Sequence, residues 1–383
     1  MLGCMGQWMN ENLRDPGARR FFRSRNQGAA SLLLIALLAV CCDGPASETG
    51  QKIAPPTGGG IYLGAYADLG LVYQLTGEYG SSALEPDLLP EFYGQSLDEM
   101  FGRKLAIRTS GWALPFIHDE GLVIEGQPGR LTFDAAGHRR AWEEFGYTAT
   151  YCLGDQKLPG IFTEVKDGLW DERIDALARQ LAEYPYPVFF EYWVEADTAG
   201  IGPEDQADFK AMLVRVHDRV EAIAPRKVTW VAPTVVAWPL PIDGYEPLYR
   251  NYYPGDAYVD WHGVSLFCSR ETSTDYFPPR QCLEGVREQI GDLASKPVML
   301  EQFGLMRTLA GVDKSDADRE TWYRGFLAEV HDFPEIAAIL WVQNDYVNWN
   351  SALKVAEPAV QAIREEIAAH PDAWLSDVQT AAP

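Results

Sequence analysis

The chain has 383 residues, of which 47% are hydrophobic and 12% aromatic, and this is enough to bury one large core. Its 32 Lys and Arg residues stand against 55 Asp and Glu residues, which gives a formal net charge of -23. Such an acidic surface repels phosphate backbones and anionic lipid headgroups, which argues against nucleic acid as a partner. A neutral ligand fits this charge, although the charge can also serve solubility alone.

The first 42 residues have the proportions of an export signal. Four arginines between residues 19 and 25 precede the apolar run AASLLLIALLAV at 29–40, which is too short to cross a bilayer. The run ends at Cys41 and Cys42, and small and polar residues follow, as is typical of lipoprotein signals in which a cysteine is acylated. We therefore expect an exported protein, periplasmic or on the outer surface, with membrane attachment through a lipidated Cys41 or Cys42.

Residues 43–59 are rich in Pro, Gly, Ser and Thr and predict a flexible linker, so the folded domain is expected at 60–383. Within it, short β-rich runs alternate with longer amphipathic helical patterns. Eight strands are expected, at 61–66, 104–109, 147–152, 188–195, 227–234, 259–267, 297–303 and 336–342. Apolar stripes predict helices around the fourth strand, at 174–181 and 209–223, and a last helix is expected at 358–369. Eight alternating units favour a single α/β domain, a (β/α)8 TIM barrel.

Three cysteines lie beyond the signal, at Cys152, Cys268 and Cys282. Neither they nor the six scattered histidines have the spacing of metal ligands, so no metal and no cofactor is expected. In an oxidising compartment Cys268 and Cys282 could form a disulfide, and two free buried thiols are an equally good interpretation.

The fourth strand ends with two carboxylates, at the strand end where such barrels carry their working residues. Strand alternation predicts that Glu191, Trp193 and Glu195 share one face. Glu191 would then lie deeper in the barrel and need a partner such as Arg108, because an isolated buried carboxylate is unfavourable. Taken alone, Glu195 is better explained as an ordinary solvated carboxylate at the start of a loop.

The seventh strand is apolar until Glu301. If Glu301 faced the helices, its charge would lie between packed apolar surfaces, so we expect it to face the mouth of the barrel. The ends of the fourth and seventh strands lie across this mouth from each other. Two carboxylates about 5–5.5 Å apart in that arrangement are what a retaining glycosidase needs.

Aromatic side chains near strand ends suit a glycan, because the C–H-rich faces of sugar rings stack on aromatic planes. The candidates are Trp112, Trp193, Phe267 and Trp341. Most of the twelve tryptophans are nonetheless expected in the core, and Trp112 and Trp341 are the better candidates for sugar contacts.

Three segments resemble glycoside hydrolase family 26 and occur in the order that the family has. They are DGLWDERI at 167–174 followed by PVFF at 187–190, YPGDAYVDWHG at 253–263, and KPVM at 296–299. The resemblance extends from about residue 60 to 367 and implies a retaining endo-acting enzyme on β-mannan, or on β-1,3-xylan or mixed-linkage glucan. It implies that Glu195 is the acid/base, with Asp197 just beyond it as a substrate contact.

The sequence departs from the family at the nucleophile position. Alignment on Phe303 and Gly304 puts Gln302 at this position and Glu301 one place earlier. Gln302 cannot attack, because a neutral amide oxygen forms no stable glycosyl ester. Either a one-residue bulge, which is common at barrel rims, brings Glu301 into the nucleophile position, or the nucleophile is missing. Because alternation sends neighbours to opposite faces, only one of the two can occupy that position.

Smaller departures lie nearby. Phe267 replaces an aromatic residue that usually bears a hydroxyl, Val194 stands where histidine is frequent, and Glu191 replaces a strand arginine. The favoured interpretation is a monomeric retaining endo-β-glycanase with Glu195 as acid/base, Glu301 as nucleophile and a polysaccharide as substrate. Gln302 is expected to contact the substrate. The alternatives are a catalytically inactive barrel that binds a polysaccharide, for example in exopolysaccharide assembly, and a purely structural surface lipoprotein.

Overall fold

Most of the chain beyond residue 51 is described by a computed structural model. The described residues are 52–66, 101–109, 123–124, 127–128, 131, 135–140, 142–143, 146, 148–154, 157, 159–237, 248–269, 273–342, 345–346, 349–350 and 357–381. All of them belong to one compact unit that spans Thr49–Pro383. The expected export signal, its lipidated Cys41 or Cys42, and Trp112 lie outside the described residues, so the signal and the attachment stay predictions.

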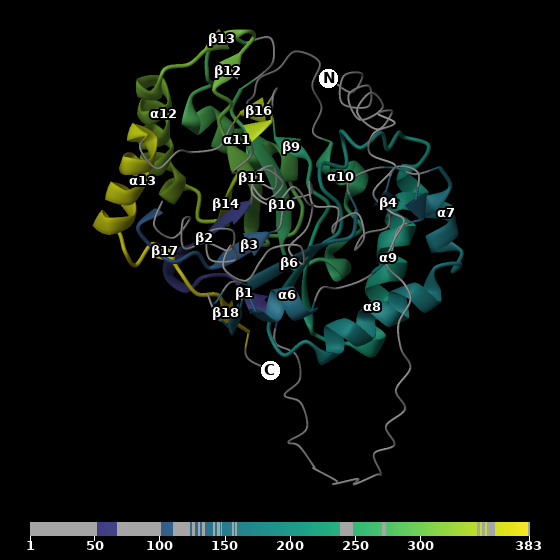
Figure 1. Ribbon diagram of the computed structural model, residues 1–383. Coiled ribbons are helices and arrows are strands. Elements are labelled where there is room, and N and C mark those ends of the chain that lie inside the picture. Colours follow the sequence, from purple (N-terminus) through teal and green to yellow (C-terminus); the bar gives the residue numbers. More distant parts are fainter. Residues whose placement is uncertain are drawn as a thin grey trace, which may run out of the picture. The chain divides into compact units, whose positions relative to one another are not determined.

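A parallel sheet forms the centre of this unit (Figure 1). Its strands follow the order β8 (Val228–Val231), β7 (Val188–Glu191), β6 (Thr148–Cys152), β3 (Ile107–Thr109), β2 (Ile61–Tyr66), β14 (Ile336–Val342), β11 (Val298–Gly304), β10 (His262–Phe267) and β9 (Val236–Ala237), and β17 (Trp374–Leu375) also pairs with β2. Each of the eight predicted ranges contains one strand of this sheet, so the predicted α/β class with a parallel sheet is confirmed.

Helices follow the strands along the chain. They are α6 (Ala135–Arg140), α7 (Ile161–Lys166), α8 (Asp171–Glu183), α9 (Gln206–Ile223), α10 (Tyr249–Tyr252), α11 (Pro279–Ile290), α12 (Asp316–Glu329) and α13 (Pro358–Ala369), with 3-10 turns at Thr57–Gly59, Asp256–Tyr258 and Val330–Asp332. Two-stranded antiparallel pairs are formed by β1 (Ile53–Ala54) with β18 (Gln379–Thr380), β4 (Val123–Ile124) with β5 (Gln127–Pro128), β12 (Thr308–Leu309) with β13 (Val312–Asp313), and β15 (Asp345–Tyr346) with β16 (Trp349–Asn350).

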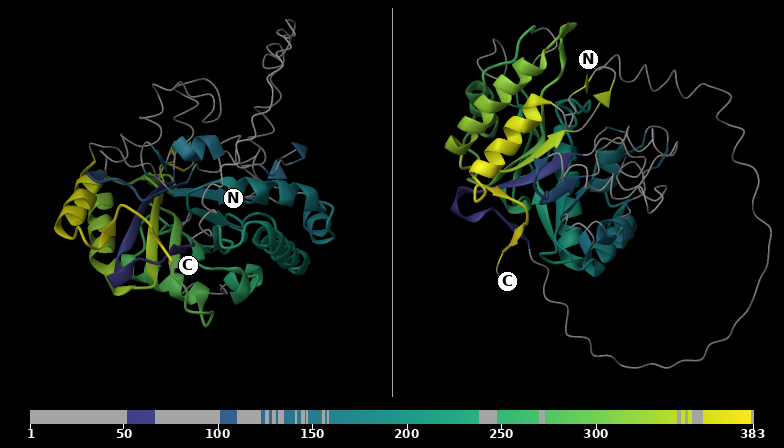
Figure 2. Two further views of the ribbon diagram at one scale, coloured as in Figure 1. Left: turned by 90° about the horizontal axis from the view of Figure 1, so that it is seen from below. Right: turned by 60° about the vertical axis from the view of Figure 1, so that its left-hand side comes forward.

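The helices bury the apolar stripes that the sequence predicts. In α9, Phe209, Met212 and Val216 are fully buried, and α8 buries its stripe from Ile174 to Leu181. Helices α8 and α9 pack against each other on one side of the sheet, and α12 and α13 on another (Figure 2). The helix layer therefore arises from the 3.6-residue apolar period.

The two faces of the sheet have separate apolar cores. In β14, Ile339 and Trp341 belong to the large cluster under the helices, whereas Leu340 belongs to a smaller cluster on the opposite face. This alternation follows from the two-residue period of a strand. The smaller cluster also contains Tyr62 and Phe189, from strands that are distant in the sequence.

Strand β8, at one end of the sheet order, approaches the entry of β10 near the other end. An isolated parallel bridge joins Val231, the last residue of β8, to Trp261, which directly precedes β10. The backbone N–H of Ala232 donates to the carbonyl oxygen of Trp261 at 2.9 Å. Strands β8 and β10 are thus in contact, although the bridge is shorter than a regular ladder.

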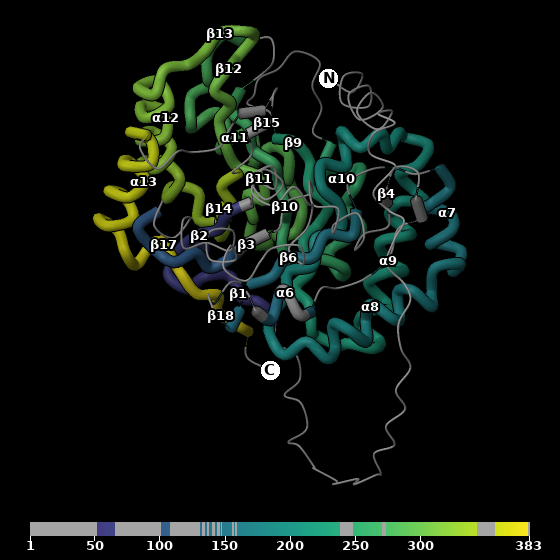
Figure 3. Tube along the Cα trace, in the orientation of Figure 1, coloured from purple at the N-terminus to yellow at the C-terminus, as the bar shows by residue number. Residues whose placement is uncertain are grey.

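The segments near the two ends of the described chain lie side by side, because β1 pairs with β18 (Figure 3). Ile53 is only 3% exposed, its backbone N–H donates to the Thr229 hydroxyl at 2.6 Å, and its carbonyl accepts from the Trp261 indole at 3.3 Å. The flexible linker predicted over 43–59 is therefore wrong from Lys52 onward, since apolar burial and hydrogen bonds fix these residues to the sheet.

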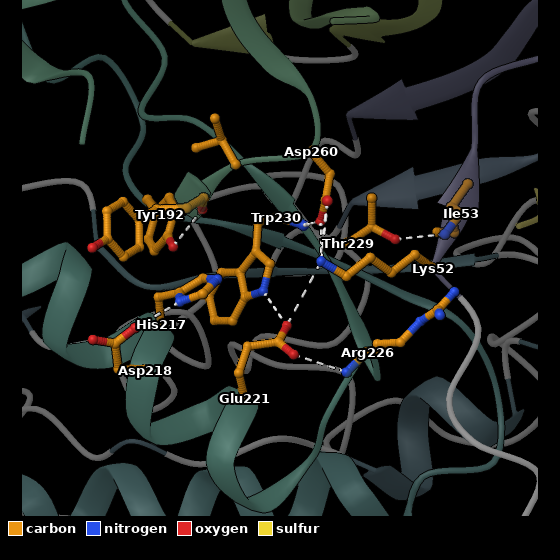
Figure 4. A network of polar contacts seen from close by, with 12 residues as sticks. Lys52, Ile53, Tyr192, His217, Asp218, Glu221, Arg226, Thr229, Trp230 and Asp260 are labelled. Atoms are coloured by element: carbon orange, nitrogen blue, oxygen red, sulfur yellow. Dashed lines mark hydrogen bonds and ion pairs between the residues drawn. The ribbon is translucent and has the colours of Figure 1, made fainter. Parts of the chain in front are cut away.

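A polar network extends this attachment (Figure 4). The Lys52 ammonium donates to both carboxylate oxygens of Asp260, at 3.0 and 2.9 Å, and Asp260 also accepts the backbone N–H of Trp230 at 2.9 Å. The indole of Trp230 donates to Glu221 of α9 at 2.7 Å. The network joins the N-terminal segment to β8, to α9 and to the entry of β10.

Within the described part of the chain, no helix combines the length and apolar character needed to span a membrane.

Candidate functional site

Glu195 lies on a turn just beyond β7, in a conformation that few non-glycine residues adopt. The strand ends at Glu191, and Glu195 has φ 46°, in the left-handed region. Two hydrogen bonds to Thr234, which follows β8, fix this turn. The backbone N–H of Glu195 donates to the Thr234 hydroxyl at 2.7 Å, and that of Ala196 donates to the Thr234 carbonyl at 2.9 Å. Strained backbone of this kind persists where surrounding contacts over-determine it.

The carboxyl group of Glu195 is surrounded by protein, although the residue as a whole keeps some contact with solvent. This desolvation, and after it the charge of Asp197, raise the pKa of Glu195 to about 7 against the opposing effect of the nearby Ser265 and Thr198 hydroxyls. The Thr198 hydroxyl lies 3.4 Å from Oε2. A carboxyl group with this pKa holds a proton near neutral pH, as a general acid must.

Asp197 follows two residues later on the same turn. Its carboxylate accepts the backbone N–H of Val236, in β9, at 3.2 and 3.3 Å from the two oxygens. Burial raises the pKa of Asp197 to about 7 against the effect of backbone N–H donors from Val236, Asp197 itself and Thr198. The turn thus carries two carboxyl groups that both titrate near neutrality.

Glu301 is the extra residue of a β-bulge. The neighbours Val264 and Ser265 of β10 pair with Leu300 and Gln302 of β11, so Glu301 has no partner in that ladder. The pairing with β14 is irregular over the same residues. The structure therefore contains a bulge of the kind that the first alternative requires. A bulge interrupts the pleat, so strict alternation does not apply at Glu301 and Gln302, and which of them occupies the nucleophile position stays a prediction.

The Glu301 carboxyl lies near other carboxyl groups. Glu301 is fully buried, and burial raises its pKa well above the ordinary value, with further contributions from Glu191 and then from Glu195. The nearby side chain of Gln302 lowers that pKa. Glu191, Glu195 and Glu301 therefore lie within electrostatic reach of one another, although they come from β7, the turn after it and β11.

Two aromatic residues expected to bind sugar are instead part of the core. Trp193 is fully buried against Phe162 of α7 and Phe209 of α9, at ring-centroid distances of 5.6 and 5.4 Å. The expected shared face of Glu191, Trp193 and Glu195 is wrong because the strand ends at Glu191, and alternation ends with it. Trp193 then turns toward the helices.

Trp341 is likewise sealed. It is 1% exposed and packs on Phe303, Tyr323 and Phe326, at ring-centroid distances of 4.8, 5.4 and 6.4 Å. Its place in the alternation of β14 puts it on the helix-facing side, so the expected sugar contact is wrong. Trp112 lies outside the described residues, and its expected role stays a prediction.

Phe267 and Gln302 remain next to the carboxyl groups. Phe267 ends β10 two residues after Ser265, so the two side chains share a face, and Phe267 is 2% exposed. Gln302 is also buried, at 4% exposure. Sequence analysis missed Ser265, Thr234 and Thr198. Of these three, only Ser265 could have been recognised from the sequence, because it is a small polar residue within the apolar part of its strand.

The site offers carboxyl groups and neutral donors, and the arrangement does not resemble a metal centre. Among the residues that the structure describes, no group of three or more His, Cys, Asp and Glu side chains is placed to hold a metal ion.

Cys268, directly after Phe267, and Cys282 of α11 are free, buried thiols. Burial raises the pKa of Cys268, and a hydrogen bond with Cys282 adds to this, so the two thiols are in contact.

Solved structures show that the chain has a glycoside hydrolase family 26-like fold. The catalytic domain of a family 26 endo-β-1,4-mannanase from a Bacillus species has a TM-score of 0.55 at 14% identity, covering 82% of this chain and 87% of that one. A family 26 β-mannanase from Bacteroides ovatus has a TM-score of 0.51 at 14% identity, covering 83% and 90%. A double mutant of the endo-β-1,4-mannanase of Cellulomonas fimi has a TM-score of 0.52 at 14% identity, covering 82% and 72%.

Sequence comparison reaches less of the chain. A β-1,3-xylanase from a Vibrio species is 25% identical over 133 residues, which are 34% of this chain and 27% of that protein. The chain therefore spans about a quarter of the length of the curated relative it matches. No family model matches the sequence.

Proposed function

We propose that this protein is a retaining endo-β-glycanase built on a closed (β/α)8 barrel. The observation that carries the proposal is the approach of Glu195 and Glu301, which come from the ends of the fourth and seventh barrel strands, β7 and β11. A retaining glycosidase needs two such carboxyl groups, one as acid/base and one as nucleophile. The contact between β8 and β10 at Val231 and Trp261 supports closure of the barrel.

In the proposed reaction, the Glu301 carboxylate attacks the anomeric carbon of a β-linked sugar. The bond from that carbon to the glycosidic oxygen breaks, and Glu195 gives its proton to the departing oxygen. The ionised Glu195 then takes a proton from water, whose oxygen displaces Glu301 from the glycosyl ester. The pKa of Glu195 near 7 suits both steps, because the group can hold and then accept a proton at neutral pH. No cofactor takes part.

The mannanase fold and the partial match to a β-1,3-xylanase favour a β-linked polysaccharide as substrate. The N-terminal signal pattern supports export and attachment through Cys41 or Cys42, and we propose that the enzyme acts as a monomer. Phe267 and Gln302 are the proposed sugar contacts, since Gln302 adjoins Glu301 in β11 and Phe267 shares a face of β10 with Ser265.

The test is hydrolysis of a panel of β-mannan, β-1,3-xylan and mixed-linkage glucan, with products identified by mass. Glu301→Gln and Glu195→Gln should each lower kcat by several orders of magnitude, and a fluorosugar probe should label Glu301. The matched control is Asp208→Asn, which changes a carboxylate of α9 that pairs with Lys166. Full turnover by Glu301→Gln would exclude Glu301 as nucleophile.

One observation favours the second candidate, a polysaccharide-binding barrel without catalysis. The raised pKa of Glu301 favours the protonated carboxyl, which is a poor nucleophile. Under this alternative, the wild-type protein would bind a glycan from the panel in calorimetry and release no product from it. Product release by the wild type, abolished in Glu301→Gln, would reject the alternative.

A further inference from the structure

Two carboxyl groups share one tight turn at the proposed catalytic site. The backbone N–H groups of Thr198 and Ala199 both donate to the carbonyl of Glu195, at 2.8 and 3.1 Å, and this closes the turn that carries Glu195 and Asp197. Of the two carboxyl groups on this turn, the proposed mechanism uses only that of Glu195. Asp197 is nevertheless buried beside it and is bonded to β9.

The turn is held in place by the two neighbouring strands. Asp197 accepts the N–H of Val236, and Val236 pairs with Ser265 in the β9–β10 ladder, which brings the Ser265 side chain near the Glu195 carboxyl. The Glu195 N–H donates to the Thr234 hydroxyl. The Asp197 carboxylate therefore cannot move without breaking a bond to β9, and the backbone of Glu195 is fixed at Thr234.

The two carboxyl groups have different kinds of hydrogen-bond partner. Asp197 faces backbone N–H groups of Val236, Thr198 and its own residue, and an N–H can only donate, so it favours the ionised carboxylate. Glu195 faces the hydroxyls of Thr198 and Ser265, which can donate to a carboxylate or accept from a carboxylic acid. When the pair holds a single proton, this difference favours the charge on Asp197 and the proton on Glu195.

We infer that Asp197 is a positioning residue that acts through Glu195. Its carboxylate, fixed by the Val236 N–H, keeps on Glu195 the proton that the glycosidic oxygen receives. The inference rests on the proposed function, because it assigns the cause of the protonation that the general acid needs. Among the described residues, the other titratable groups facing the pair are Glu301 of β11, toward Glu195, and Tyr252 of α10, toward Asp197.

The first test is the pH dependence of kcat/KM in the full chain. Asp197→Asn keeps the acceptor oxygen for Val236 and removes the charge. The basic limb of the profile, which reports loss of the Glu195 proton, should then move to lower pH by about one unit, the scale of a nearby charge. Asp208→Asn, on α9, should leave the profile in place. A purely structural role for Asp197 would lower kcat without moving the limb, and that result would overturn the inference.

The second test does not need turnover. In full-length protein with 13C-labelled glutamate carboxyl groups, the signal lost in Glu195→Gln identifies Glu195, and its titration is followed by NMR. We expect its midpoint to fall by about one pH unit in Asp197→Asn. If this change occurs in a protein that cleaves no glycan, the proposed function fails and the proton assignment stands. If glycan is cleaved and the Glu195 midpoint is the same in both proteins, the inference fails and the proposed function stands.

Discussion

Asp260 joins the N-terminal segment to the sheet through Lys52, and replacing it should measurably destabilise the fold. Its carboxylate accepts two hydrogen bonds from the Lys52 ammonium and one from the backbone N–H of Trp230 (Figure 4). Asp260→Ala removes all three hydrogen bonds at once. Asp260→Asn keeps an oxygen for Trp230 and removes only the charge that attracts Lys52.

The two variants should differ because the two interactions contribute unequally. The side chains of Lys52 and Asp260 are 24% and 28% exposed, and an ion pair this accessible contributes at most about 1 kcal/mol. Trp230 is fully buried, and leaving its N–H without an acceptor costs about 1–3 kcal/mol. We therefore expect Asp260→Ala to lower the free energy of unfolding by about 2–4 kcal/mol, and Asp260→Asn by about 1 kcal/mol or less.

Urea unfolding followed by tryptophan fluorescence measures both losses. Lys52→Met should lower the free energy of unfolding by about as much as Asp260→Asn. The variant that carries both substitutions should lose less than the sum of the two single losses, because both substitutions remove the same ion pair. Asp218→Ala is the matched control, since this residue is exposed on α9 and should change stability by less than about 0.5 kcal/mol. The reasoning would be refuted if Asp260→Asn destabilised as much as Asp260→Ala, because the ion pair would then be the main contribution.

Three further outcomes are expected. Thr234→Val removes the hydroxyl that accepts the Glu195 N–H. The kcat should then fall at least about tenfold, and the free energy of unfolding should fall by no more than about 3 kcal/mol. An unchanged kcat would contradict this. Trp341→Ala should cost about 3–5 kcal/mol in urea unfolding, with unchanged glycan affinity in the folded protein. Because folded Glu195 and Asp197 have pKa values of about 7, above the ordinary values of 4.5 and 3.8, the folded protein binds more protons than the unfolded chain between these values. Unfolding free energy should therefore fall as pH rises from 5 to 8, with each group contributing at most about 1.4 kcal/mol per pH unit, and Glu195→Gln should reduce that fall.

The sequence predicted the framework of the fold well because apolar periodicity and burial have the same cause. The last predicted helix coincides with α13, and the predicted eighth strand coincides with β14. Strand ends were less predictable. The fourth and fifth predicted strands extend beyond β7 and β8, because Trp193 and Thr234 are as compatible with a strand as with the turns that they occupy.

The aromatic residues show a different reason for error. Trp193 and Trp341 lie next to strand ends, and position along the chain does not reveal which face of a sheet a side chain occupies when the strand end is unknown. Both proved to pack under helices. Their burial also agrees with the general preference of tryptophan for protein interiors. Ile53 was misassigned because its short strand exists only through pairing with β18, more than 300 residues away in the sequence.

The carboxyl groups of the site depend on irregular backbone, and this explains why their arrangement is a property of the tertiary structure. Glu195 has a left-handed φ, which costs a non-glycine residue about 1–2 kcal/mol, and Glu301 interrupts a ladder. Neither feature lowers the local energy. Each persists because neighbouring strands supply the missing bonds, as Thr234 does for Glu195. A regular strand in either place would satisfy the apolar pattern equally well and would separate the carboxyl groups, so the geometry of the site is retained at the expense of local stability.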